Sequence, residues 1–212
     1  MQALQGLENT SSSVRLQAVM AIGTAPDPGY VDGLVDRCAV EPDFYVRDML
    51  TWAITRHPAA VTVPRLVGEL RSANPQARSQ ALHTLSKVGD RTAWPAITRE
   101  LLTDADDEVA RTAWRTAVAL VPEDAKPGLA AVLTSQLGRG DRATRLSLSR
   151  ALIALGETIV PTLEAAMRST DPHVAGHAAA TRRLLDDPDA GFELAVDEAI
   201  RIVALGPQAR EK

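Results

Sequence analysis

The sequence is short of cysteine, of aromatic side chains and of net positive charge. Its single cysteine, Cys38, excludes a framework of internal disulfide bonds, and we expect a reducing, cytoplasmic setting. Aromatic residues make up only 3% of the 212 residues, so the core must come from Ala, Leu, Val and Ile, which suit closely packed helices. The net charge of −4 provides no overall positive field that would attract nucleic acid.

Long apolar runs are lacking as well. No eighteen consecutive residues are apolar, and the opening sequence MQALQGLENTSSS has no basic segment followed by an apolar one. We therefore expect neither a membrane span nor a signal peptide, and no membrane partner.

The sequence does contain an internal repeat. Six similar segments begin at intervals of 30 to 35 residues, at Ser11, Asp43, Asn74, Asp106, Asp141 and Asp171. Each first residue is of a type whose side chain accepts hydrogen bonds from the first turn of a helix. Mostly apolar residues follow in steps of four, four and three, which trace one face of a helix.

A second amphipathic pattern precedes each of these helices. Prolines recur two residues before an apolar position, and we expect them near helix starts, at Pro64, Pro95, Pro127 and Pro161. Each repeat is then a helical hairpin, which buries its apolar face only by stacking on its neighbours. We predict an all-α, right-handed superhelical solenoid in a single domain, 1–212, with a capping helix at 190–205. The predicted hairpins are approximately residues 2–25, 28–57, 60–88, 92–120, 125–155 and 158–185.

The pattern Asp-x-x-Val-Arg-x-x-Ala-x-x-x-Leu of the second helix resembles the HEAT repeat, particularly the short bacterial variety related to phycobilisome-lyase repeats. The resemblance covers the chain from about Leu4 to Leu205. It implies that the arginines after the valine form a ladder with acids or amides of neighbouring turns, at Arg15, Arg47, Arg78 and Arg145. Ala110 and Ala175 interrupt that ladder. A resemblance of this kind speaks for the fold and not for a function.

No catalytic constellation is evident in the sequence. His173 and His177 have a spacing that could bind a metal, but Val-Ala-Gly lies between them and there is no glutamate base or third ligand. Deoxyhypusine hydroxylases, which use a similar fold, hold iron with His-Glu pairs, and this chain contains no His-Glu dipeptide. We predict that the chain is not an enzyme, with no metal and no cofactor, and that Cys38 is a buried packing residue.

The residues that point off the apolar stripe of the second helices are candidates for binding. In this fold the second helices line the concave surface, and Trp and Arg dominate binding hot spots. The candidates are Met49, Trp52, Arg56, Gln80, His83, Lys87, Arg111, Arg115 and Arg150. Alternatively, Trp52 fills a groove between helices and the arginines only solvate the surface. Trp94 and Trp114 are interpreted as packing residues.

Charge is divided between the two layers. The six second helices carry a net charge of +5 and the remainder −9, which favours an acidic partner. We predict a protein-interaction or scaffold module that binds an acidic peptide or protein segment on its concave face. Two alternatives stay open: a nucleic-acid-binding solenoid similar to alkylpurine DNA glycosylases, and a ligand-sensing or regulatory module associated with a transcription factor.

Overall fold

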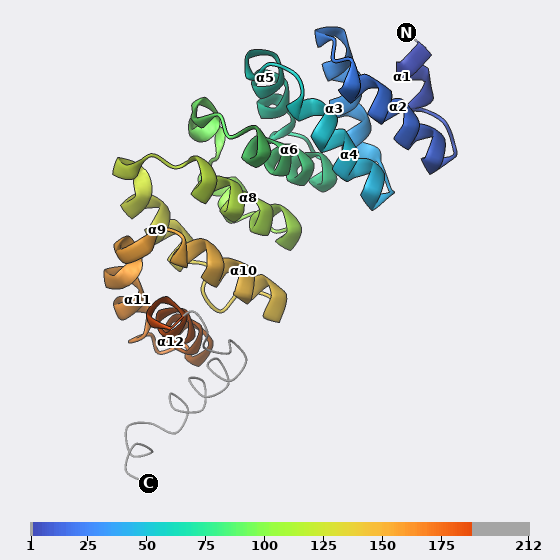
Figure 1. The fold of residues 1–212 in the computed structure, drawn as a ribbon. Helices are drawn as coiled ribbons and strands as arrows, with labels where there is room; N and C mark the ends of the chain where they lie inside the picture. The colour runs from blue at the N-terminus through green and yellow to red at the C-terminus, as the bar shows by residue number, and fades with distance from the viewer. Residues whose placement is uncertain (1, 188–212) are drawn as a thin grey trace. The chain divides into compact units, whose positions relative to one another are not determined.

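The computed structural model describes residues 2–187, and all regular elements in this range are helices (Figure 1). The predicted capping helix at 190–205 lies outside the described residues. The helices group into two compact units, with the division between Leu120 and Val121. The assignment of the whole chain to a single domain stays a prediction.

The first unit contains four helical pairs. The pairs are α1 (Gln2–Gly6) with α2 (Ser12–Thr24), α3 (Val31–Val40) with α4 (Phe44–Thr55), α5 (Ala59–Glu69) with α6 (Pro75–Val88), and α7 (Arg99–Leu102) with α8 (Asp107–Leu120). Short 3-10 helices, η1 (Pro28–Tyr30) and η2 (Arg91–Ala96), precede α3 and α7. The second helices α2, α4, α6 and α8 lie side by side, each in contact with the next (Figure 1). They form the layer on which the candidate site lies.

The second unit contains two more pairs. They are α9 (Lys126–Thr134) with α10 (Arg142–Ile153), and α11 (Val160–Ala166) with α12 (Pro172–Asp186). The 3-10 helices η3 (Glu123–Ala125) and η4 (Gly156–Ile159) lead into α9 and α11. Here too first helix contacts first helix and second contacts second, α9 with α11 and α10 with α12. Each unit is thus a stack of helical hairpins, as the repeat predicts.

Five of the six predicted capping residues accept hydrogen bonds from backbone N–H groups of the first helical turn. They are Asp43, Asn74, Asp106, Asp141 and Asp171. Ser11 has the same extended backbone but makes no such side-chain bond; its own N–H donates to Asn9 instead. The predicted stripe is also displaced by one residue in α2, where Val14 is 39% exposed and Arg15 is buried. Arg15 is buried because its guanidinium pairs with the carboxylate of Glu41 in the next repeat.

Two prolines lie deeper in their helices than predicted. Pro64 is inside α5, because Pro58 caps that helix and starts it five residues earlier. Pro95 is inside the 3-10 helix η2, so the first helix of the fourth pair is reduced to the four residues of α7. Pro127 and Pro161 occupy first turns, as predicted.

Leu, Ile, Val and Ala dominate the core. Trp114 is fully buried in the first unit, and its indole N–H donates to the Leu102 carbonyl at 2.8 Å, so its assignment as a packing residue is confirmed. Cys38 is also buried as predicted, and burial raises the pKa of its thiol to about 12. Within residues 2–187 no single helix is long and apolar enough to cross a membrane; one bent pair, Arg142–Ile153 with Gly156–Ala166, passes that test by length and composition only.

Three of the four ladder arginines, Arg15, Arg47 and Arg78, connect a second helix to the turn that precedes it, whereas Arg145 donates from Nε to the carbonyl of its own cap, Asp141, at 3.4 Å. In the first three repeats the arginine Nη1 donates to the carbonyls five and six residues earlier, at distances between 2.8 and 3.3 Å. Arg15 and Arg78 also bind an acid in the next repeat, Glu41 and Asp104 respectively. The expected ladder therefore exists in the first unit, and it links neighbouring hairpins.

Glu41 is the most enclosed acid of this ladder. Its carboxylate is fully buried and accepts from Arg15, from Arg37 and from the backbone N–H of Asp43. Burial by itself would raise the pKa of Glu41, but the hydrogen bonds from these three groups lower it to about 2. The carboxylate is therefore ionised at neutral pH and holds two arginines in place.

Candidate binding groove

A groove of about 890 Å³ lies on the first unit, on the layer of second helices. The amino-terminal half of α4 forms one wall, with Phe44, Arg47, Asp48 and Thr51. Helix α6 forms the floor along most of its length, and α8 forms the other wall. The three helices come from three successive repeats, so the groove exists only because the hairpins are stacked.

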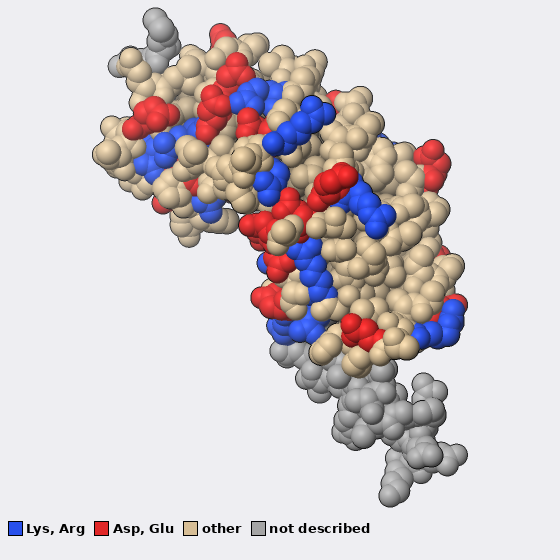
Figure 2. All heavy atoms as spheres, turned by 180° about the vertical axis from the view of Figure 1, so that it is seen from behind, with Lys and Arg blue, Asp and Glu red and all other residues tan. Residues whose placement is uncertain are grey.

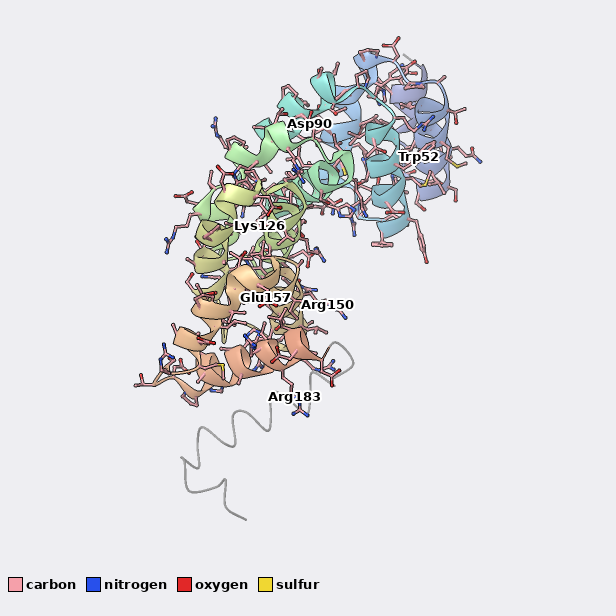
Figure 3. All side chains as sticks on the ribbon, turned by 60° about the vertical axis from the view of Figure 1, so that its left-hand side comes forward. Trp52, Asp90, Lys126, Arg150, Glu157 and Arg183 are labelled. Atoms are coloured by element: carbon pink, nitrogen blue, oxygen red, sulfur yellow. The ribbon has the colours of Figure 1, made fainter. Side chains whose placement is uncertain are left out.

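Four of the nine predicted site residues line this groove: Gln80, His83 and Lys87 of α6 and Arg115 of α8. Met49, Trp52, Arg56 and Arg111 belong to the same unit but do not line it. Arg150 is on α10 of the second unit (Figure 3). The structure therefore brings together four of the nine candidate binding residues in one groove.

Trp52 packs toward α2 (Figure 3). Its ring lies so close to Gly23 that a Cβ atom at this glycine would overlap it, and the side chain is 37% exposed. Trp52 thus covers a glycine on the neighbouring helix, the arrangement described by the alternative in which it fills a gap between helices.

The groove carries charges of both signs. Its cations are Arg47, Lys87 and Arg115, and its acids are Asp48, Asp106 and Glu108. Two of the acids have partners: Asp106 caps α8, and Glu108 lies 3.6 Å from both Arg111 and Arg115. Basic and acidic side chains are also interspersed on the face of the molecule in Figure 2.

His83 of α6 lines the groove, and these charged side chains act on it. Burial lowers the pKa of its imidazole, and the nearby Lys87 and Arg115 lower it further, while Asp48 and Glu108 act in the opposite direction. The neutral imidazole, which can both donate and accept a hydrogen bond, is favoured at pH 7.

In the second unit, His177 is one of the two histidines whose spacing could bind a metal, and its side chain lies in the core. The residue is fully buried, its Nδ1 accepts from the Gly138 N–H at 3.0 Å, and its Nε2 lies 3.0 Å from the Arg145 carbonyl. Ser149 completes this polar cluster, with its hydroxyl 3.0 Å from the same Nε2. Burial lowers the pKa of His177 to about 4. The imidazole is a neutral hydrogen-bonding group of the core.

No three His, Cys, Asp or Glu side chains gather into a possible metal site anywhere in residues 2–187.

Arg47 and Phe44 line the groove but are missing from the predicted site. From the sequence, Arg47 belongs only to the ladder. One feature of the sequence distinguishes Arg47 from the other two ladder arginines. Arg15 and Arg78 each have an acid two residues before the cap of the next repeat, at Glu41 and Asp104, whereas the equivalent residue for Arg47 is Ser72. Aligning the repeats at their caps is sufficient to show this substitution.

No protein-family model and no curated protein matches this sequence. Among solved structures, Kap121p bound to Nup53p superimposes with a TM-score of 0.62 at 18% identity, over 96% of this chain and 25% of that chain. The complex of CpcE and CpcF of phycocyanin lyase from Nostoc sp. PCC7120 gives 0.50 at 17% identity, over 98% of this chain and 89% of that chain. The fold is that of a HEAT-like helical-repeat protein. The predicted all-α solenoid class is confirmed, and the chain spans about a quarter of the Kap121p chain.

The prediction that the chain is not an enzyme requires correction. A phycocyanin lyase is among the solved structures with this fold, and human deoxyhypusine hydroxylase superimposes at a TM-score of 0.47 and 16% identity, over 97% of this chain and 96% of that chain. The first of these likenesses shows that the fold occurs in an enzyme. The absence of a metal-binding histidine motif and of His-Glu pairs therefore does not exclude catalysis.

Proposed function

We propose that this chain is a protein-binding module whose first unit holds an acidic peptide or protein segment in the groove over α4, α6 and α8. The observation that carries the proposal is the groove itself: about 890 Å³, built by three successive second helices and lined by Gln80, His83, Lys87 and Arg115. A groove of this size with several separate polar groups suits an extended segment that makes contacts along its length.

The solved structures support a protein partner. Kap121p, whose fold is similar, has been crystallised bound to Nup53p, to Ste12p and to the extreme C-terminus of the phosphatase Cdc14p. Stacked helical hairpins are therefore able to present a surface to other polypeptides. For this chain we place that surface on the layer of second helices.

The charges support an acidic partner. Asp106 and Glu108, two of the three acids in the groove, already interact with groups of α8, whereas Lys87 makes no hydrogen bond or ion pair within residues 2–187. An acidic segment would gain contacts with Lys87 and Arg115, and attraction between unlike charges would raise its rate of association.

A selection from random twelve-residue peptides displayed on phage tests this proposal. The bait is the full chain, and the comparison bait carries Lys87→Glu together with Arg115→Glu. We expect enriched peptides to be rich in Asp and Glu, and the comparison bait to bind them at least about tenfold more weakly.

The matched control reverses two exposed arginines of the same unit that do not line the groove, Arg91→Glu with Arg99→Glu. It has the same net charge as the groove variant, and it should bind the enriched peptides as well as the unaltered chain. Equal losses in both variants would show a general charge effect, and no loss in either would place binding elsewhere.

A further inference from the structure

Two ladder arginines bind a carboxylate through a pair of parallel hydrogen bonds. Arg15 donates from Nε and Nη2 to the two oxygens of Glu41 at 2.7 and 2.6 Å, and Arg78 donates in the same way to Asp104 at 3.1 and 3.2 Å. In both cases the acid also accepts the backbone N–H of the cap two residues later. A guanidinium held in this way presents two donors spaced to match a carboxylate.

Arg47 has the same fastening but no acid. Its Nη1 donates to the carbonyls of Glu41 and Pro42 at 2.8 Å, which orients the guanidinium as in the other two repeats. At the equivalent position in the next turn, the Ser72 hydroxyl accepts the Asn74 N–H at 3.2 Å, and a hydroxyl cannot bind the arginine as a carboxylate does. Among residues 2–187, the hydrogen bonds of the Arg47 side chain all come from Nη1, and its Nε and Nη2 form no hydrogen bond or ion pair.

The surroundings of Arg47 resemble those of a binding residue. It is half-buried in the α4 wall of the groove, and its guanidinium lies 6.0 Å from the centre of the Phe44 ring. Phe44 is 66% exposed and meets the 74% exposed Tyr45 edge to face. Exposed aromatic rings beside an oriented arginine are typical of the residues that dominate binding energy.

We propose that Arg47, flanked by Phe44, binds a carboxylate side chain of the partner segment in this groove. The partner's Asp or Glu takes the place that Glu41 and Asp104 hold in the other repeats, and an apolar neighbour of that acid packs on the Phe44 ring. The inference rests on the proposed function and specifies which chemical group the partner must bring to the α4 wall of the groove.

Restoring the missing acid tests this inference. Ser72→Asp places a carboxylate where Asp104 stands in the next repeat, so it should bind Arg47 and compete with the partner. The matched control is Ser72→Asn, which is uncharged and still accepts the N–H of the cap, as Asn9 does in the first repeat. The probes are peptides selected on the unaltered chain from the twelve-residue library, each synthesised also with its acids changed singly to amides or to phosphoserine.

We expect Ser72→Asp to weaken binding at least about tenfold and Ser72→Asn to change it less than about twofold, because only the former occupies the arginine. One Glu→Gln or Asp→Asn change in the peptide should cause the same loss on the unaltered chain and no further loss on Ser72→Asp. Thermal unfolding confirms that both variants fold.

Equal affinity of the acidic peptides for Ser72→Asp and the unaltered chain would overturn the inference. Tighter binding of the phosphoserine peptides than of their acidic parents would also overturn it, in favour of a phosphate ligand. If binding is insensitive to Ser72→Asp but is lost in the Lys87/Arg115 variant, the proposed function stands and only the role of Arg47 fails.

Discussion

At the scale of single residues, the first unit depends on buried charges that have complete sets of partners. Glu41 binds Arg15 of α2, Arg37 of α3 and the backbone N–H of Asp43, the cap of α4, so one side chain connects the second helix of one repeat to both helices of the next. Removing one partner of a buried ion pair costs more than the pair contributes, because the remaining charge is left without compensation.

Glu41→Gln should therefore destabilise the chain by about 3 kcal/mol at pH 7. Urea denaturation measures the change. Glu8→Gln is the control: that carboxylate is exposed and lies 3.7 Å from Arg37, so its loss should have little effect. Because folding lowers the pKa of Glu41 to about 2, its contribution is present above about pH 4.5 and is lost as the pH falls toward 2. A variant as stable as the unaltered chain would show that the carboxylate's charge is not needed.

His177 should make the second unit sensitive to a different pH range. Folding lowers the pKa of its imidazole to about 4, so the unfolded chain binds a proton more readily, and stability falls as the pH decreases from about 6.5 to 4. The loss should approach about 3 kcal/mol at the lower end. His177→Gln, which has no titrating group, should flatten the stability profile in this range. His173→Gln, at an exposed position of the same helix, should leave the profile unchanged, and a flat profile for the unaltered chain would contradict the assignment.

At the scale of helices, the sequence predicts those features that a repeated local interaction determines. Capping residues and apolar spacing recur in each repeat, and together they predict where in the sequence all six second helices lie. The exceptions arise where a distant partner decides the orientation. Arg15 turns inward because Glu41 is available in the next repeat, and His177 turns inward because Gly138, Ser149 and the Arg145 carbonyl satisfy its ring. Neither contact is visible in a helical periodicity.

The candidate site also combines residues that local spacing predicts with residues whose placement depends on a distant partner. Its central row, Gln80, His83, Lys87 and Arg115, lies on the outward face that the helical spacing identifies. Trp52 belongs to that row by spacing, but Gly23 on the adjacent helix provides a surface on which its ring packs. Arg47 was not predicted, because its role depends on the absence of an acid in another repeat, which no pattern within α4 reveals.

Helix α2 offers a test of capping. Ser11 has the extended backbone of the other caps but makes no side-chain hydrogen bond to the helix. Ser11→Asp should supply that bond and raise the free energy of unfolding by about 0.5–1 kcal/mol. Ser13→Asp, in the first turn of the same helix, separates capping from the favourable effect of a negative charge near a helix start. Equal gains in the two variants would show that the charge alone is responsible.

At the scale of the whole molecule, the division into two compact units predicts two levels of stability. Backbone amides of helices within one cooperative unit exchange with solvent hydrogen at a common free energy of opening. We expect residues 2–120 and 121–187 to form two such groups. Glu41→Gln should accelerate exchange in the first group and leave the second unaffected. Acceleration of similar size in both groups, measured by mass spectrometry of peptide fragments, would show that the chain opens as one unit.

The serine at position 72 also bears on which hairpin of a repeat protein binds the partner's acidic group. An acid two residues before a cap occupies its arginine and so competes with outside ligands. Where a neutral acceptor stands at that position, as Ser72 does, the arginine is open and the neighbouring helices α4, α5 and α6 still pack on one another. The same exchange at Asp104 would free Arg78 beside a smaller cavity of about 370 Å³ that these two residues help to line. Single substitutions at one repeat position could thus move the point of attachment from hairpin to hairpin, and so supply new partners without a new fold.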